Sequence, residues 1–179
     1  MERLRVLKSN KNAHGTVACD NTTMHLLQAN DFVGEAIRKE SGICHHEAQM
    51  IWQAMQSINI EGAELLFVES VSNLVCPASF DLGEDCRVTL IASTEGDDKP
   101  KKYPRMFLTS ELMLISKADL LPYVPFSIEA VTKDALEVNP KIEVLTISST
   151  SGEGIDKWFE WLMERVEEKK MEAALKNEI

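Results

Sequence analysis

The segment LMLISKADLLPY, residues 112–123, begins with a continuous apolar run, residues 112–116, and ends in a polar turn. Three other runs are similarly short, continuous and partly β-branched: residues 64–69, 87–93 and 143–148. Runs of this kind are typical of strands buried on both faces, as in a parallel sheet. The sequence therefore predicts four such strands.

Segments with helical spacing of apolar residues accompany these strands. One apolar stripe lies within residues 45–58, and another lies within residues 127–138 and comprises Ile128, Val131, Ala135 and Val138. A further helix is expected from residue 155 to about residue 175, with an apolar first half that packs and a charged second half that is solvated. This alternation predicts an α/β fold, an open sheet with ligand-binding loops at the carboxyl ends of its strands.

The composition bounds the class of protein. With 179 residues and 44% hydrophobic content, the chain is long enough for one α/β core, so residues 1–179 are expected to form a single domain. A formal charge of −10 argues against a nucleic-acid surface. No apolar run approaches the roughly 20 residues that span a bilayer, and the start, MERLRVLKSNKN, lacks the apolar core of a signal peptide. A cytoplasmic protein without a membrane or nucleic-acid partner is expected.

The four cysteines stand at positions 19, 44, 76 and 86, without paired C-x-x-C spacing. Because the start of the chain shows no export signal, disulfides are not expected. Cysteines in a reducing compartment are more often buried small hydrophobes than metal ligands, so composition alone favours that interpretation.

The turn that follows residues 112–116 has the form of a loop that recognises guanine. The stem of Lys117 would cover the base, and the carboxylate of Asp119 would accept hydrogen bonds from guanine N1 and N2, donors that adenine does not supply. The strand expected at 143–148 is followed by a second polar turn, residues 148–152. Its backbone N–H groups, including that of Ser149, could face the base oxygen. A plain strand-to-helix turn is the alternative for either loop taken alone.

Four segments together resemble the HypB family, the GTP-binding nickel metallochaperones of hydrogenase maturation: VESVSNLVCPASFDLGE, STEGDDKPKKYPRMF, LISKADLLPY and EVNPKIEVLTISSTSGEG. The resemblance covers roughly residues 40–165. It implies a P-loop-GTPase-like three-layer fold with a mostly parallel sheet and a truncated or degenerate N-terminal part. Residues 1–40 would be divergent and residues 165–179 a charged helical tail. It also implies a homodimer that works with hydrogenase maturation proteins and the hydrogenase large subunit.

The family's metal site maps onto Cys44, His45 and Cys76. Thiolate and imidazole ligands suit Ni(II) or Zn(II), and three ligands leave a position open for metal transfer. The alternative is a buried cysteine beside a histidine that caps the 45–58 helix. Three further candidates have no counterpart among the family's ligands: Cys19, Cys86 and His46. Asp81, Glu84, Asp97 and Asp98 could form a second, weak cation site, but solvated loop charge is the favoured interpretation.

The sequence departs from the family at the phosphate end of the nucleotide site. No stretch of the 179 residues fits G-x-x-x-x-G-K-[ST], the loop that cradles phosphates and supplies the hydroxyl for Mg²⁺. Residues 14–19 form a candidate strand that is followed by Thr22 and Thr23 without room for such a loop. One of these two hydroxyls could be a remnant of the Mg²⁺ ligand or a helix cap. Two serines also differ: Ser72 replaces a glycine, and Ser116 replaces the usual asparagine or threonine.

Three functions remain open from the sequence. The first is a HypB-type metallochaperone that binds nickel or zinc, with binding of GTP and Mg²⁺ weakened or lost. The second is a divergent GTPase that still binds guanine nucleotide through Lys117, Asp119 and a loop near Thr22. The third is a degenerate, non-catalytic interaction module. No residue is assigned a catalytic role, and little or no GTPase activity is expected because phosphoryl transfer depends on charge neutralisation at the missing loop.

Overall fold

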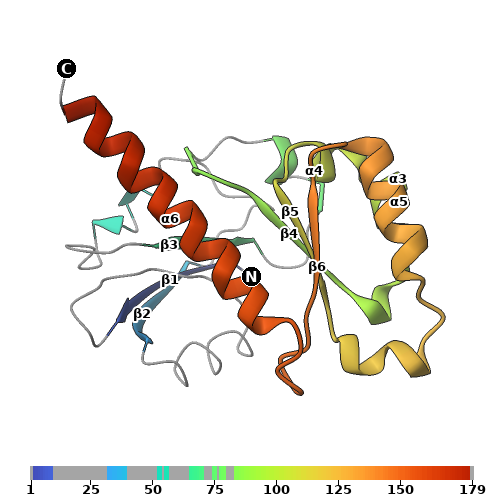
Figure 1. Ribbon diagram of the computed structural model, residues 1–179. Coiled ribbons are helices and arrows are strands. Elements are labelled where there is room, and N and C mark those ends of the chain that lie inside the picture. The colour runs from blue at the N-terminus through green and yellow to red at the C-terminus, as the bar shows by residue number, and fades with distance from the viewer. Residues whose placement is uncertain are drawn as a thin grey trace.

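The computed structural model describes residues 2–9, 32–39, 52–53, 55–56, 65–70, 74–75, 77–79 and 83–177. These residues form two three-stranded sheets and a set of helices (Figure 1). The first sheet has the order β2-β1-β3 and comprises β1 (Glu2–Ser9), β2 (Phe32–Lys39) and β3 (Leu66–Ser70). The second has the order β4-β5-β6 and comprises β4 (Val88–Ala92), β5 (Leu112–Ser116) and β6 (Glu143–Thr146).

The second sheet is wholly parallel, as the apolar runs predict. Val88 pairs with Leu112 at one end of β4 and β5, and Ala92 pairs with Ser116 at the other. β6 pairs in parallel with β5 from Glu143 to Thr146. The segment expected at 112–116 is confirmed to the residue, whereas β4 and β6 are shorter than the runs at 87–93 and 143–148. All three carboxyl ends therefore lie at one edge of this sheet.

The run at 64–69 departs from the expectation of a fourth strand in that parallel sheet. Residues 66–70 form β3, which pairs antiparallel with β1 in the separate sheet, with Leu4 opposite Val68. The strands β1 and β2 themselves were not predicted. A short apolar run indicates a buried strand, but it does not specify which neighbouring strand forms the hydrogen bonds with it. The side chain of Leu66 is also 37% exposed, so burial on both faces does not hold there.

The parallel sheet carries a helical layer on each face (Figure 1). One layer comprises α3 (Lys99–Lys102), α4 (Pro104–Leu108) and α5 (Ile128–Val138); the other is α6 (Ile155–Asn177). Successive residues of β5 alternate between the two cores, because side chains on a strand point to opposite faces. Met113 and Ile115 belong to the α4–α5 core, and Leu112 and Leu114 belong to the α6 core. The α/β three-layer fold is confirmed.

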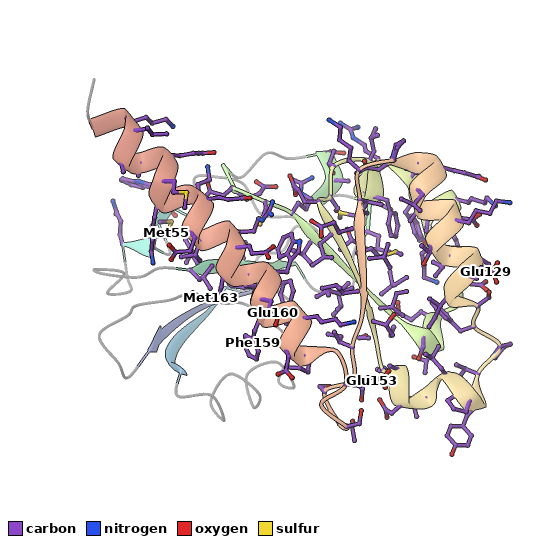
Figure 2. All side chains as sticks on the ribbon, in the orientation of Figure 1. Met55, Glu129, Glu153, Phe159, Glu160 and Met163 are labelled. Carbon is purple, nitrogen blue, oxygen red and sulfur yellow. The ribbon has the colours of Figure 1, made fainter. Side chains whose placement is uncertain are left out.

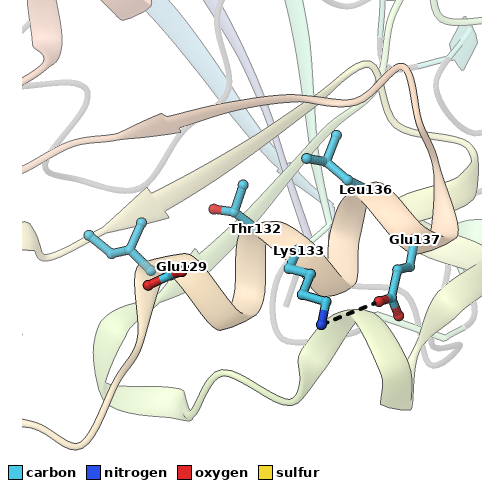
Figure 3. Close-up of a pocket in the computed structure, with 6 residues that line it drawn as sticks. Glu129, Thr132, Lys133, Leu136 and Glu137 are labelled. Carbon is cyan, nitrogen blue, oxygen red and sulfur yellow. Dashed lines mark ion pairs between the residues drawn. The ribbon is translucent and has the colours of Figure 1, made fainter.

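Helix α5 begins where the sequence expects it. Ser127 is its N-cap, and the Ser127 hydroxyl accepts a hydrogen bond of 3.1 Å from the Ala130 N–H. Val131 and Ala135 are fully buried, as predicted. Ile128, predicted to share their stripe, is 36% exposed instead. It lies with Thr132 and Leu136 along a shallow, open depression on the outer face of α5 (Figure 3).

Helix α6 divides as expected into a packed half and a solvated half. Trp158, Trp161 and Leu162 are buried, and the ring of Trp158 meets Phe67 of β3 edge-on at 6.4 Å between centroids. Residues 167–176 are all exposed. Phe159 lies on the packed half of the helix (Figure 2). In the part of the chain that the structure describes, no helix combines the length and the apolar character needed to cross a membrane.

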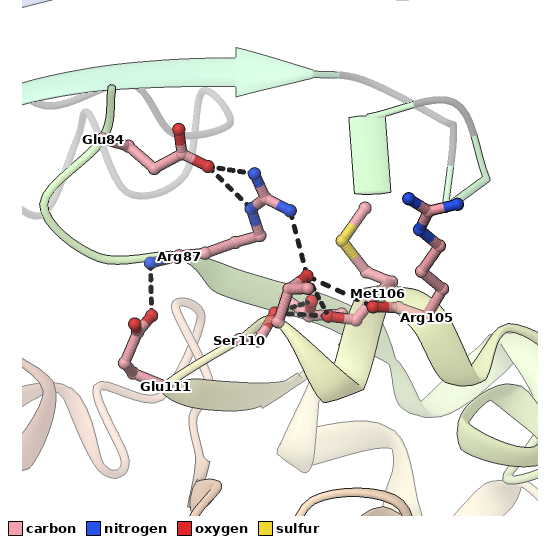
Figure 4. A network of polar contacts seen from close by, with 8 residues as sticks. Glu84, Arg87, Arg105, Met106, Ser110 and Glu111 are labelled. Carbon is pink, nitrogen blue, oxygen red and sulfur yellow. Dashed lines mark hydrogen bonds and ion pairs between the residues drawn. The ribbon is translucent and has the colours of Figure 1, made fainter. Parts of the chain in front are cut away.

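A polar network holds the amino ends of β4 and β5 together (Figure 4). The Arg87 guanidinium forms an ion pair with Glu84 and donates to the Thr109 hydroxyl at 2.9 Å. The Arg87 backbone N–H donates to the Glu111 carboxylate at 2.6 Å. These contacts lie at the edge of the sheet opposite to the carboxyl ends of its strands, so they support the frame of the sheet.

Candidate functional site

The turns after β5 and β6 lie side by side because their strands are adjacent and parallel. The Ile147 N–H donates to the Ile115 carbonyl at 2.8 Å, and the Ala118 N–H donates to the Ile147 carbonyl at 3.1 Å. These bonds continue the pairing of β5 and β6 beyond the last ladder residues. The turn after β5 enters the short helix η3 (Ala118–Tyr123), which brings the side chain of Asp119 toward the neighbouring turn.

A hydrogen bond between side chains joins the two turns. The Ser148 hydroxyl donates to Oδ1 of Asp119 at 2.6 Å, and the same hydroxyl oxygen accepts a bond of 3.1 Å from the Ser151 N–H. Ser148 is fully buried, whereas Asp119 is half-buried. Among the described residues, Oδ2 of Asp119 has no hydrogen-bond partner. Asp119 therefore presents one fixed and one unengaged carboxylate oxygen, an arrangement suited to a ligand that offers N–H donors.

Lys117 begins the same turn in a left-handed backbone conformation, with φ 59° and ψ 45°. It is the one non-glycine residue with positive φ in the part of the chain that the structure describes. Its side chain is exposed, and Nζ lies 3.5 Å from the hydroxyl oxygen of Thr94, in the turn after β4. The lysine thus extends over the carboxyl edge of the sheet without an ion-pair partner among the described residues.

The loop after β6 leaves the predicted Ser149 available. The backbone N–H groups of Ser148, Ser151 and Gly152 are used by bonds within the loop, to Glu153 O, Ser148 Oγ and Ser148 O respectively. None of these bonds uses the N–H of Ser149, whose side chain is half-buried. Ser149 as a base-contacting residue remains a prediction. The side chain that contacts Asp119 is that of Ser148. Its position as the first hydroxyl after β6 is the signal by which it could have been found.

The predicted metal ligands Cys44, His45 and Cys76 lie outside the described residues. The same holds for Thr22 and Thr23, and for three further candidates: Cys19, His46 and Asp81. The described residues contain no group of three histidine, cysteine or carboxylate side chains that could hold a metal ion.

Carboxylates of the alternative cation site have protein partners instead. Asp97 accepts a hydrogen bond of 3.1 Å from the Ser127 N–H, Asp98 lies 3.6 Å from Lys99 Nζ, and Glu84 is paired with Arg87. The contact of Asp97 ties the turn after β4 to the first residue of α5. A cation at these residues would compete with those bonds, which agrees with the favoured interpretation of loop charge.

Cys86 lies half-buried against the α6 core, where Phe67 and Val88 also pack. Burial raises the pKa of its thiol from 9.0 to about 11, and the nearby carboxylates of Glu111 and Asp85 add to the rise. A thiol with this pKa is protonated at neutral pH, so Cys86 behaves as the small hydrophobe that composition predicts.

Alkylation of Cys86 at pH 8 is expected to be slow in the folded protein. A rise of two pKa units lowers the thiolate fraction, and with it the rate, about 100-fold relative to an unperturbed thiol. Peptide mapping by mass spectrometry after timed treatment with iodoacetamide follows Cys86 separately from the other cysteines. Equal labelling rates for Cys86 in the folded and urea-unfolded protein would contradict this expectation.

Comparison with known proteins identifies the family and the fold. Residues 12–146 match the family described as CobW/HypB/UreG, nucleotide-binding domain. The hydrogenase maturation factor HypB of Escherichia coli K12 is 54% identical over 119 residues, which is 66% of this chain and 41% of that protein. The chain therefore spans about two fifths of the length of this relative.

Two solved structures have the same fold. HypB from Helicobacter pylori, crystallised in complex with nickel, superposes with a TM-score of 0.74 at 31% identity, covering 87% of this chain and 73% of that one. HypB from Archaeoglobus fulgidus gives a TM-score of 0.68 at 29% identity, covering 85% and 73%. The resemblance seen in the sequence is thereby confirmed. The chain belongs to the CobW/HypB/UreG family of nucleotide-binding domains, and these three relatives are HypB proteins.

Proposed function

We propose that this chain is a HypB-type hydrogenase maturation factor that handles nickel or zinc and recognises guanine through Lys117 and Asp119, with weak nucleotide affinity. The observation that carries the guanine assignment is the 2.6 Å bond from Ser148 to Asp119. It fixes one carboxylate oxygen and leaves the other for N–H donors of a ligand. Guanine offers two such donors, at N1 and N2, on one edge.

Lys117 and Ser149 complete the proposed base site. The aliphatic stem of Lys117 would cover one face of the base, and the N–H of Ser149 would face the base oxygen. An adenine in the same place would leave the Asp119 carboxylate without donors and would place its own amino group against the Ser149 N–H. Unpaired polar groups of this kind are the cost that produces discrimination between bases.

Weak affinity follows from the sequence, which has no G-x-x-x-x-G-K-[ST] loop within its 179 residues. Charge-assisted hydrogen bonds to phosphate are worth roughly 1.5 to 3 kcal/mol each, so the absence of several removes most of the affinity that a nucleotide gains from its phosphates. Binding of GTP with Mg²⁺ would then depend on the base site alone.

The metal assignment rests on the donor set Cys44, His45 and Cys76 and on the family. Two thiolates and an imidazole suit Ni(II) and Zn(II), and an incomplete ligand shell allows the ion to be passed on. The HypB relative from Helicobacter pylori was crystallised with nickel, which supports nickel as the cargo. The proposal also includes a homodimer and a single domain over residues 1–179. It places the protein in the cytoplasm, with hydrogenase maturation proteins as partners.

Asp119→Ala is expected to remove the preference for guanine. Loss of a charged acceptor for two N–H donors should lower GDP affinity about 100-fold, to below detection, and leave ADP binding as weak as before. Ligand-observed NMR at millimolar GDP or ADP measures binding in this weak range. Asp98→Asn, a change at an exposed carboxylate outside the site, is the matched control and should bind GDP as the parent does.

The parent protein itself decides whether this account of the site holds. Preferential binding of GDP over ADP by the parent, lost in Asp119→Ala and kept in Asp98→Asn, is the expected pattern. Equal binding of both nucleotides by the parent, or full GDP binding by Asp119→Ala, would show that Asp119 does not read the base.

Purified protein is expected to show no sustained hydrolysis of GTP. Hydrolysis needs positioned charge at the γ-phosphate, and the sequence lacks the loop that supplies it. Phosphate release in the presence of Mg²⁺, followed over hours at saturating GTP, is the measurement. Multiple turnovers that persist through successive purification steps would favour the divergent GTPase instead.

A further inference from the structure

We propose that Ser93, at the start of the turn after β4, is a positioning residue that holds Lys117 in its left-handed conformation. The inference rests on the proposed guanine site only for its functional consequence. Ser93 opens the short helix η2 (Ser93–Glu95) and is 2% exposed. Its hydroxyl donates to the backbone carbonyl of Lys117 at 2.8 Å, across 24 residues of sequence.

The conformation of Lys117 needs such support. For a residue with a Cβ, the left-handed region is less favourable than the right-handed helical region by roughly 1 to 2 kcal/mol. The Lys117 carbonyl accepts two hydrogen bonds, one from Ser93 and one of 3.0 Å from the Leu120 N–H. The bond from Leu120 is local to the turn and would accompany several turn geometries. The bond from Ser93 comes from the turn after β4, a different part of the chain, and fixes the direction of the carbonyl relative to the sheet.

The residue after Ser93 contacts the other end of the lysine. Thr94 Oγ1 lies 3.5 Å from Lys117 Nζ. Consecutive residues of one turn therefore contact the backbone and the side-chain tip of the lysine that would cover the base. The turn after β4 consequently sets both the backbone geometry of Lys117 and the direction of its side chain.

The neighbouring Ser116 does not replace this role. Its hydroxyl donates to the Ile91 carbonyl at 3.1 Å, and Ser116 is already paired with Ala92 in the β4–β5 ladder. That bond adds to an existing strand pairing and does not reach the Lys117 carbonyl. Ser93 is therefore the side chain that links β4 to the left-handed residue itself.

The test measures the Lys117 backbone and nucleotide affinity separately, in the whole chain. A positive φ places the amide proton close to the residue's own Hα, so the intraresidue NOE of Lys117 is strong in the parent. In Ser93→Ala this NOE is expected to weaken, and GDP affinity should fall about 3- to 10-fold, the range of one lost neutral hydrogen bond. Ser93→Thr, which keeps the hydroxyl, should restore both.

Ser110→Ala is the matched control. Ser110 is also 2% exposed and its hydroxyl also donates to a backbone carbonyl at 2.8 Å, that of Met106, but at the opposite edge of the sheet. It should leave the Lys117 NOE unchanged. If Ser93→Ala does not fold, Ser93→Cys carries the test, because a thiol of similar size is a much weaker donor.

Each outcome decides the proposal. A Lys117 NOE that weakens in Ser93→Ala but not in Ser110→Ala supports it. An unchanged NOE overturns it, even with a loss of GDP affinity, because Ser93 would then act by another route. If the parent binds no GDP, the proposed guanine site fails, while the NOE still decides whether Ser93 positions Lys117.

Discussion

Gly154→Ala is expected to lower the free energy of unfolding by about 3 to 5 kcal/mol, a large part of the roughly 5 to 15 kcal/mol by which native domains are stable. Gly154 has φ +71°, and an added Cβ would lie far inside van der Waals contact with the Thr146 carbonyl oxygen, at the end of β6. The obstacle is backbone, so no rotamer change relieves the clash. Urea denaturation followed by the fluorescence of the buried Trp158 and Trp161 measures the effect.

Gly152→Ala separates the clash from the cost of positive φ. Gly152 lies in the same loop with φ +82°, but an added Cβ there meets no atom within 4 Å. Only the conformational strain remains, so the loss should be about 1 to 2 kcal/mol. Equal losses in the two variants would show that the loop does not pass as closely over Thr146 as the structure places it.

The sequence predicts best those elements whose pattern is local. The strand at 112–116 is recovered to the residue because an uninterrupted apolar run lies between polar turns. The division of α6 into packed and solvated halves follows from apolar residues that stop where charge begins. Asp119 was proposed from a Lys-x-Asp turn after a buried strand together with the polar turn at 148–152, and its contact with guanine stays a prediction.

The sequence predicts less well what depends on partners far along the chain. β3 pairs with β1, a strand that the sequence pattern does not predict. Backbone hydrogen bonds between strands depend little on side-chain composition, so the sequence does not show which strands pair. Ile128 is the first residue of α5 and lies beyond the end of the core, so helical spacing wrongly predicts that its side chain is buried. Ser148 and Ser93 lie on the turns after β6 and β4, on either side of the turn that holds Lys117 and Asp119. A shift of one residue in either turn would bring a different side chain to Asp119 or Lys117, and the sequence does not specify such a shift.

Cys76→Ser is expected to abolish stoichiometric nickel binding. The proposed site has three ligands, and a serine hydroxyl stays protonated at neutral pH and is a poor ligand for borderline-soft ions. Loss of outer-shell partners already costs about 10- to 100-fold in metal affinity, so loss of a direct thiolate ligand should cost more than about 100-fold. Zinc should follow the same pattern.

Cys86→Ser is the matched control for that variant. Both variants replace one thiol by a hydroxyl, but burial keeps the Cys86 thiol protonated, with a pKa of about 11. Cys86 has no counterpart among the family's ligands, and a protonated thiol is not a metal ligand, so it should contribute nothing to metal affinity. Cys86→Ser should therefore titrate as the parent does.

The central claim, that this HypB-family chain handles metal, is tested most directly by anaerobic titration of the parent, Cys76→Ser and Cys86→Ser with Ni(II). Bound metal per chain and oligomeric state are determined on the same samples. The account predicts stoichiometric binding by the parent and by Cys86→Ser, and none by Cys76→Ser. A parent that binds no nickel, or a Cys76→Ser variant that binds it as the parent does, would contradict the account.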